Sequence, residues 1–348
     1  MRGLAASGAG RSDAGRVRDA NEDRVLVLER AGFRASLYAV ADGLGGHAAG
    51  DVASEICVQV LRTRTPALLA ARVPPREALI RTLREANDAI RARAAAPGRA
   101  GMATTCTALL CVDAEALVAH VGDSRAYLLR GREIRQLTTD HSLVQALVRR
   151  GGVAPRDADD HAQRHVLTRA LGVEPDVQVD VLSVPLHGGD VLCLTSDGLS
   201  GAVPAEEIAA VLRAAPGASA ACDALVALAN ARGGLDNASA VVVRLRPRWA
   251  AALARGAAPV GIAAALAAGA GAYQLEHSYF LGVRDGRVAV MRGVPARVLG
   301  VALFSLERPT PVPLARIAPA YRASLAQGIP VHSPQDAQSL LDDLVRRP

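Results

Sequence analysis

Apolar residues along this chain fall into short runs and helical repeats as far as about Arg246. Short runs rich in Val, Leu and Ala, bounded by turn-forming residues, predict β-strands. The predicted strands are Arg24–Glu29, Ser36–Ala41, Thr104–Val112, Ala116–Val121, Ala126–Leu129, Val177–Val184, Asp190–Thr195 and Ser239–Leu245.

Apolar residues that recur every three or four positions predict helices among these strands. The predicted helices are Ala48–Arg62, Pro75 to about Ala95, one that begins at Pro204, and Ser219 to Ala231. Adjacent strands separated by pairs of helices predict an α+β fold with stacked sheets covered by helices. They do not fit a Rossmann-type fold, in which single strands and helices alternate. The polar segment Asp140–Gly172 is expected to form an irregular lobe beside this core.

Three of the apolar runs end at an aspartate, namely Asp42, Asp123 and Asp197, and Asp236 comes just before Ala240–Val243. A carboxylate at the end of a buried strand is unfavourable unless a cation satisfies it. Several such strand ends, brought together, would form an oxygen-only site of the kind that Mg²⁺ or Mn²⁺ prefers. The pattern therefore predicts a metal-dependent enzyme.

A single Asp-Gly dipeptide usually marks a turn. Here the pattern recurs where strands meet turns, and Glu22-Asp23 adds two more carboxyl groups before another strand. So many negative charges fit two divalent ions and would repel one another without them. The glycine after Asp42 would let the backbone approach, so that the Gly43 carbonyl could also be a ligand.

Two such ions, roughly 4 Å apart, can activate a water towards a phosphorus centre. A phosphate substrate also needs a planar cation, and Arg18 is the candidate because it lies just before Glu22-Asp23. The alternative is that Arg18 is an ordinary surface arginine.

Composition narrows the remaining choices. The chain has 348 residues, a net charge of +6 and no lysine, and its arginines are scattered without interleaved aromatic residues, so nucleic-acid binding has little support. Its five cysteines show no zinc-ligand spacing, which suits a reducing compartment. The first 23 residues do not have the pattern of a secretory signal.

After Arg246 the pattern changes. The segment 247–255 is a basic linker, and 256–275 is an uncharged stretch of about twenty residues, long enough to cross a bilayer. Trp249 and Tyr273 lie near its ends, and the arginines before it predict a cytoplasmic N-terminal side. The tail 276–348 would then be exported, and it ends in a predicted helix at Ser333–Arg346. The alternative is an Ala-rich helix buried in a soluble protein.

Six motifs, taken in order, resemble those of the metal-dependent (type 2C) serine/threonine protein phosphatases. They are Arg18-Asp-Ala-Asn-Glu-Asp23, Ala41-Asp-Gly-Leu-Gly-Gly-His47, Gly101-Met-Ala-Thr-Thr105, Gly122-Asp-Ser-Arg-Ala-Tyr127, Thr195-Ser-Asp-Gly198 and Asp236-Asn-Ala-Ser239. Any one of them would be weak, but the order and spacing together are specific. They place the catalytic domain at residues 7–246.

The resemblance implies a four-layer α-β-β-α sandwich with the metals in a cleft at one end. It implies that Asp23, Asp42, the Gly43 carbonyl, Asp197 and Asp236 hold two Mn²⁺ or Mg²⁺ ions, with Glu22 acting through water. Asp123, together with Asp197, would match a third, weaker site. Arg18 would bind phosphate, and Thr138–Gly172 would be the flap beside the cleft.

The implied reaction is hydrolysis of phosphoserine and phosphothreonine on proteins by an activated water, without a covalent intermediate. The expected partners are phosphorylated proteins, among them serine/threonine kinases, and the catalytic domain is expected to be monomeric. A catalytically silent scaffold of the same fold is the competing hypothesis. Loss of metal ligands would mark such a scaffold, but every expected carboxylate is present.

Three positions depart from the family pattern. Leu44 stands where many eukaryotic members have a histidine that acts as an acid, while Ala103 and Ser239 replace Gly and Thr. His47 is a tempting substitute acid, but its place before a helix favours a structural role.

The C-terminal third also resembles a known group. A basic segment, one span and the stretch Tyr279–Gly293 are similar to the membrane-anchored actinobacterial phosphatases that oppose membrane kinases. The resemblance implies a plasma-membrane protein with a cytoplasmic catalytic domain and an extracytoplasmic tail.

Overall fold

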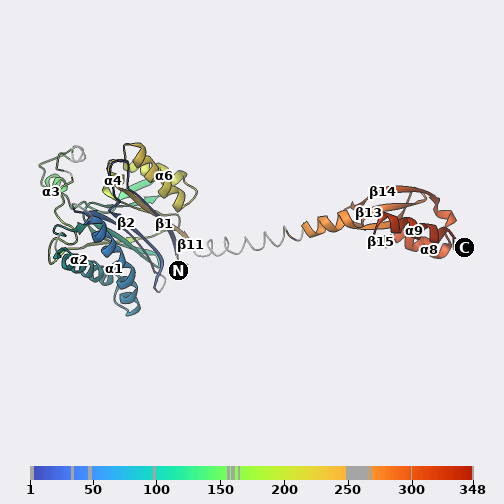
Figure 1. Cartoon of the computed structure of the whole chain (residues 1–348), viewed down its shortest axis with the longest axis horizontal. Coiled ribbons are helices and arrows are strands. Elements are labelled where there is room, and N and C mark those ends of the chain that lie inside the picture. Colours follow the sequence, from blue (N-terminus) through green and yellow to red (C-terminus); the bar gives the residue numbers. More distant parts are fainter. Residues whose placement is uncertain are drawn as a thin grey trace. The chain divides into compact units, whose positions relative to one another are not determined.

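The structure is a computed structural model that describes residues 4–32, 35–45, 49–96, 99–154, 157, 161–163, 165–247, 266, 269–298 and 300–346. The chain divides into two compact units, Met1–Ala252 and Leu253–Pro348, and each is described here by itself (Figure 1). Because the first unit includes a strand from Leu4, it begins before the predicted domain start at residue 7.

Two mainly antiparallel sheets form the centre of the N-terminal unit. One has the strand order β1-β11-β10-β7-β8, and the other β2-β3-β5-β6-β9, with β4 paired to β3. The strands are β1 Leu4–Asp13, β2 Asp23–Gly32, β3 Ala35–Leu44, β4 Ala103–Thr104, β5 Cys106–Val112, β6 Glu115–Val121, β7 Arg125–Arg130, β8 Glu133–Gln136, β9 Asp180–Pro185, β10 Val191–Thr195 and β11 Ala238–Pro247.

Three clusters of buried side chains show that the unit has four layers. Between the sheets, Tyr38 and Leu109 pack in one cluster with Leu192 and Val241. Helices α1 Gly50–Ala70 and α2 Pro75–Ala94 cover the outer face of the β3 sheet, and α5 Ala205–Ala214 and α6 Ala218–Ala231 cover that of the β10 sheet (Figure 1). The α-β-β-α arrangement expected from the sequence is therefore present.

The registers of the strands bring distant parts of the sequence to one end of this sandwich. Asp23 in β2 lies opposite Asp42 in β3. Thr195, at the end of β10, lies opposite both Ala240 of β11 and Arg125 of β7. The turns after β6 and β10 and the turn before β11 therefore meet beside the β2–β3 pair.

All eight predicted strands and four predicted helices of this unit are present, with shifted ends. The largest shift is in α1, which continues to Ala70 through Pro66 although proline usually ends a helix. Its final turns pack on α2, where the Thr65 and Thr82 hydroxyls lie 3.3 Å apart. The predicted strand Thr104–Val112 is divided into β4 and β5 at Thr105.

The sequence pattern missed β1, β8, α4 Asp197–Ser200 and, inside the lobe expected to be irregular, α3 Leu143–Arg149. Strand β1 reads as a loop because glycine, alanine and serine have low strand propensity. It forms because it pairs with β11 along its whole length. Its glycine is needed there, since a Cβ on Gly8 would lie 2.5 Å from the Tyr38 ring.

The C-terminal unit has a four-stranded sheet in the order β14-β13-β12-β15, which the sequence pattern did not predict. Its elements are β12 Tyr279–Arg284, β13 Arg287–Val298, β14 Val301–Pro313, α8 Pro319–Gln327, β15 Ile329–Val331 and α9 Pro334–Arg346. Leu281 and Val290 pack against Leu325 and Leu341 of the two helices. The predicted terminal helix is confirmed as α9, and the Ser333 hydroxyl accepts a hydrogen bond of 3.1 Å from the Asp336 amide.

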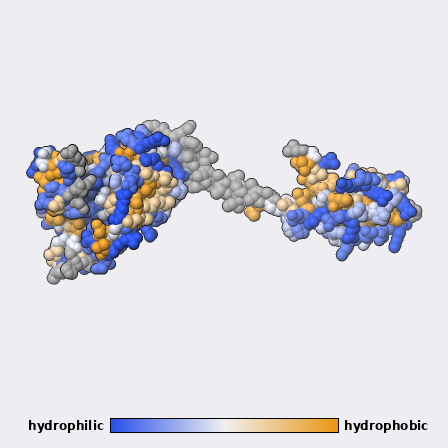
Figure 2. All heavy atoms as spheres, turned by 90° about the horizontal axis from the view of Figure 1, so that it is seen from above, coloured by the Kyte–Doolittle hydropathy of each residue, from blue (hydrophilic) through white to orange (hydrophobic). Residues whose placement is uncertain are grey.

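The predicted membrane span, 256–275, lies mostly outside the described residues, as do Trp249 and His47. Residues 269–277 are helical, and 64% of Tyr273 is exposed. Within the described ranges, no helix combines the length and the apolar character needed to cross a bilayer. On the face seen in Figure 2, hydrophobic and hydrophilic residues are intermingled over both units.

Candidate metal centre

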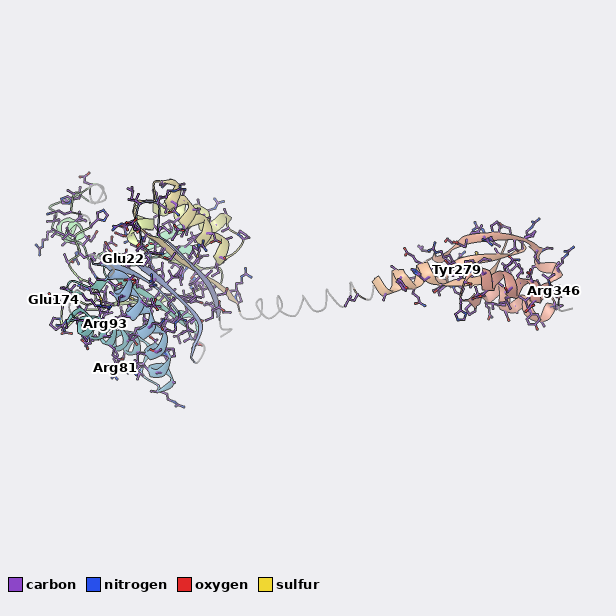
Figure 3. The ribbon with its side chains drawn as sticks, in the orientation of Figure 1. Glu22, Arg81, Arg93, Glu174, Tyr279 and Arg346 are labelled. Carbon is purple, nitrogen blue, oxygen red and sulfur yellow. The ribbon has the colours of Figure 1, made fainter. Side chains whose placement is uncertain are left out.

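The acidic side chains singled out in the sequence gather at the end of the sandwich where the two sheets meet. Asp23 and Asp42 come from β2 and β3, Asp123 follows β6, Asp197 begins α4, and Asp236 precedes β11. Figure 3 labels Glu22 between the half that carries α1 and α2 and the half that carries α4 to α6. Residues from both sheets therefore contribute to one site.

The carboxyl groups of Asp42 and Asp197 lie close enough to shift each other's pKa values. Burial, reinforced by the charges of neighbouring aspartates, raises the pKa of Asp42 well above its usual value. Burial also opposes ionisation of Asp197, but hydrogen bonds from His165 and Asp42 outweigh it and lower the pKa of Asp197. A divalent cation between these two carboxyl groups would relieve the crowding of negative charge that opposes their joint ionisation.

Asp23 is almost fully buried, with 1% of its surface exposed. Its Oδ2 accepts hydrogen bonds of 2.7 Å from both Ser196 and Ser239. Its Oδ1 is buried and has no hydrogen-bond partner among the residues that the structure describes. Burial raises the pKa of Asp23 to about 7 against these two hydrogen bonds, and the unsatisfied oxygen fits a metal ligand.

Asp123 is also buried, and it lies in a pocket with Asp197, His165 and Asp140. Burial, together with the charges of Asp197 and Asp140, raises the pKa of Asp123 to about 7. Asp140 is itself held by Arg125 through hydrogen bonds of 2.8 and 2.9 Å. Asp123 is therefore placed beside Asp197, as the accessory site predicted for this pair requires.

Arg18 and Asp236 form an ion pair, with Nη2 and Oδ2 2.8 Å apart. The next residue, Asn237, ties the segment that carries Arg18 to this site. Its side-chain amide donates to the Ala14 and Ala20 carbonyls at 2.9 Å, and its Oδ1 accepts from the Glu22 amide at 2.8 Å. The Asp-Asn motif therefore combines a site carboxylate with an anchor for the Arg18 loop.

The backbone around Asp42 is held by the two threonines of the Gly-Met-Ala-Thr-Thr motif. The Thr105 hydroxyl accepts from the Asp42 amide at 3.0 Å, and the Thr104 hydroxyl donates to the Asp42 carbonyl at 2.9 Å. Ala103, which departs from the family pattern, pairs with Leu44 across β3 and β4. Both threonine contacts are therefore made with alanine at position 103.

Close backbone packing explains why glycine follows Asp42 and Asp197. A Cβ on Gly43 would lie 2.1 Å from the Gly50 carbonyl oxygen, where α1 begins. A Cβ on Gly198 would lie 2.2 Å from the Asn237 carbonyl oxygen. Each Asp-Gly pair is thus a point of contact between a strand end and another segment, rather than only a turn.

The structure brings together Asp23, Asp42, Asp123 and Asp197. Arg18 is paired with Asp236, and the Glu22 amide is bound by Asn237. Gly43 packs against Gly50. In the part of the chain that the structure describes, no three acidic, histidine or cysteine side chains surround one point as a complete metal-binding group. His165 Nδ1, 3.5 Å from Asp197 Oδ2, and Arg18 instead hold carboxylates of the site.

Sequence reasoning missed the roles of several residues that hold the carboxylates or the backbone beside them, namely Ser196, Ser239, Asn237, Thr105 and His165. Ser196, Ser239 and Asn237 lie inside the motifs that carry Asp197 and Asp236, so their proximity in sequence was a usable signal. Ser239 replaces a threonine of the family pattern and keeps the hydroxyl. His165 has no such signal, because it reaches Asp197 from the lobe between Asp140 and Gly172.

That lobe is fixed at its base next to Asp123. The His141 amide donates to the Gly122 carbonyl at 2.7 Å, and its Nδ1 accepts from the Gly122 amide at 3.1 Å. His141 Nε2 lies 3.2 Å from Asp180, which also pairs with Arg169 at 2.8 Å. The predicted flap is therefore attached to the turn that carries Asp123.

Comparison with known proteins gives one consistent result. The sequence profile of protein phosphatase 2C matches residues 13–215. Serine/threonine phosphatase stp of Listeria monocytogenes is 41% identical over 237 residues, covering 67% of this chain and 93% of that protein.

Solved structures agree with this match. The Mycobacterium tuberculosis serine/threonine phosphatase PstP/Ppp superposes with a TM-score of 0.62 at 38% identity, covering 70% of this chain and 99% of that one. The catalytic domain of PstP in complex with two manganese ions gives a TM-score of 0.61 at 36% identity, with the same coverage.

Removing the hydroxyls that hold Asp23 should weaken metal binding. We expect Ser196→Ala and Ser239→Ala each to raise the Mn²⁺ concentration for half-maximal activity about 10- to 100-fold, since the carboxylate loses a hydrogen bond that orients it. Metal titrations of phosphatase activity measure this. Ser183→Ala, whose hydroxyl donates to Glu115 away from the site, is the matched control. Unchanged titration curves for both site variants would contradict the assignment.

The raised pKa of Asp123 should be visible in the metal-free protein. Folded Asp123 keeps its proton up to about pH 7, whereas the unfolded chain releases it near pH 4. Its contribution to the free energy of unfolding is therefore present at low pH and lost as the pH rises from about 4 to 7.

Asp123→Asn removes this titration. In chelator, the stability of the variant relative to the wild type should increase across that pH range. A difference between two proteins is needed because buried His120, with its pKa lowered to about 3, changes stability in the opposite direction. Urea unfolding followed by circular dichroism measures it, and a constant difference would refute the shift.

Proposed function

We propose a specific role for each acidic residue of this site. The starting point is that the chain belongs to the protein phosphatase 2C family and is a metal-dependent serine/threonine phosphatase. Asp23, Asp42, the Gly43 carbonyl, Asp197 and Asp236 hold two divalent ions, and Glu22 acts through water. Asp123 and Asp197 form a third, weaker site. Mn²⁺ is the ion present in the related PstP structure, and Mg²⁺ has the same preference for oxygen ligands.

The observation that carries this proposal is the state of the buried carboxyl groups. Asp42 and Asp197 lie so close that each shifts the pKa of the other, and among the described residues the buried Oδ1 of Asp23 has no hydrogen-bond partner. Crowded carboxyl groups and an unsatisfied buried oxygen are both unfavourable unless a cation neutralises and coordinates them. The Ser196 and Ser239 hydroxyls hold the Asp23 carboxyl group, and Thr104 and Thr105 hold the Asp42 backbone.

The rest of the site serves the substrate. When bound, the ions supply Lewis acidity and a nucleophilic water at neutral pH. Arg18 lies at Asp236, 2.8 Å from its carboxylate, so its guanidinium is available at the edge of the site to hold phosphate oxygens in a planar fork. Leu44 supplies no proton to the leaving group, which leaves that task to water or to another group.

Replacing either of two principal ligands should abolish metal-dependent turnover. We expect Asp42→Ala and Asp236→Ala to lower kcat for p-nitrophenyl phosphate and for phosphothreonine peptides at least about 100-fold at saturating Mn²⁺, because metal stabilisation of the reaction is worth several kcal/mol. Asp88→Ala, at an exposed aspartate of α2, is the control. Turnover similar to the wild type in either variant would refute the assignment of that ligand.

We also propose that the protein is anchored in the plasma membrane by residues 256–275, with the catalytic domain in the cytoplasm and the tail outside. The support is sequence evidence: an uncharged stretch of about twenty residues that follows a cluster of arginines. The compact fold of the tail, with its own core of Leu281, Val290 and Leu341, is compatible with a separate compartment. Membrane serine/threonine kinases are then natural substrates.

Fractionation of cells that produce the full chain tests the anchor. We expect the protein in the membrane fraction, resistant to extraction by high salt. In intact cells or spheroplasts, added protease should remove the tail and leave the catalytic domain whole. Recovery of the full-length protein in the soluble fraction would exclude the anchor.

A further inference from the structure

A second pocket opens beside the site. Its lining includes Asp197, Asp236 and His165, and also Ala202, Ala229 and Leu235. We call it the Leu235 pocket. It shares Asp197 and Asp236 with the candidate metal centre, so anything bound at that centre lies next to it. Apart from these site residues and His165, its wall consists of glycine, small or aliphatic side chains and Arg232.

Leu235 is a large apolar side chain in an unusual position, because 73% of its surface is exposed although it immediately precedes Asp236. Two glycines hold it there. Gly233 and Gly234 have φ angles of +119° and +54°, which favour glycine. The Gly234 carbonyl accepts a hydrogen bond of 2.8 Å from the Arg16 amide. Leu235 is therefore presented to solvent by a fixed turn.

Val17 repeats this arrangement on the neighbouring segment. It is 62% exposed and immediately precedes Arg18. The Arg16–Gly234 hydrogen bond on one side and the Arg18–Asp236 ion pair on the other bracket Val17 and Leu235. Two exposed aliphatic residues thus flank the cation and the carboxylate that face the substrate.

The positive charge of Arg232 in the pocket wall is neutralised by Glu207. Arg232 lines the pocket, but its Nη2 donates to both oxygens of Glu207, at 2.7 and 2.8 Å, and its Nη1 donates to the Ala202 carbonyl at 2.7 Å. The guanidinium therefore stabilises the wall rather than offering a charge to a ligand. An aliphatic group suits this wall better than a charged one, which would lose water there without gaining a partner.

We propose that the Leu235 pocket binds an aliphatic side chain next to the phosphorylated residue of the protein substrate. The inference rests on the proposed function, since it needs the phosphate to lie at Arg18 and the metal centre. Residues adjacent in an extended peptide are about 3.3–3.6 Å apart along the chain, so a neighbour of the phosphorylated residue falls beside Asp236. Leu235 then selects substrates by the residues next to the phosphorylated one.

A peptide panel on the full chain with Mn²⁺ tests this. Phosphothreonine peptides carry Leu or Ser at each of the two positions before and the two positions after the phosphothreonine. We expect Leu to raise kcat/KM about tenfold over Ser at one or more of these positions, as burial of an aliphatic group gives in an apolar pocket. In Leu235→Ser that preference should fall to about twofold or less, and in Leu235→Met it should remain.

Val173→Ser is the control, because Val173 is also exposed, at 58%, but does not line this pocket. It should keep the full preference. p-Nitrophenyl phosphate, which has no flanking residues, is measured in parallel to report on the chemistry. Equal rates for Leu and Ser peptides in the wild type, or a preference that persists in Leu235→Ser, would overturn this inference while turnover of p-nitrophenyl phosphate upholds the proposed function. Failure to hydrolyse any of these substrates would refute both.

Discussion

The repulsion among carboxyl groups held at one end of a β-sandwich is the constraint on which the rest of this structure depends. Asp42 and Asp197 lie close enough to shift each other's pKa values, and in the part of the chain that the structure describes the buried Oδ1 of Asp23 has no hydrogen-bond partner. Such an arrangement opposes folding of the metal-free chain unless other contacts hold it. Those contacts are the Thr104 and Thr105 hydrogen bonds to the Asp42 backbone and the Ser196 and Ser239 hydrogen bonds to Asp23.

The sandwich makes this possible because each sheet contributes part of the site. Asp23 and Asp42 are opposite one another in one sheet, while Asp197 and Asp236 flank the strand pair β10–β11 of the other. The chain between β6 and β7 passes from one sheet to the other and carries Asp123. A metal bound at this end would therefore tie the two layers together, so that catalysis and stability depend on the same atoms.

Substrate contacts are placed on loops around this rigid centre. Arg18 and Val17 lie on the segment before β2, which Asn237 holds by its side chain, and the flap is attached at Gly122 through His141. Leu235 stands on the turn next to the Arg18 segment, where Gly233 and Gly234 have positive φ angles. The carboxylates can therefore serve any phosphorylated residue, while the loops distinguish one substrate from another.

The sequence by itself determined the stacked sheets covered by helices in the N-terminal unit, the order of their main strands and helices, and the aspartates that meet at one end of the sandwich, because apolar periodicity and strand-end aspartates are local signals. It did not reveal β1, whose small residues form a strand only through pairing with β11, nor His165, which reaches Asp197 from a distant lobe. It also left the roles of Ser196, Ser239 and Asn237 open. Those roles depend on which atoms meet across the two sheets, and only the packing of the whole unit decides that.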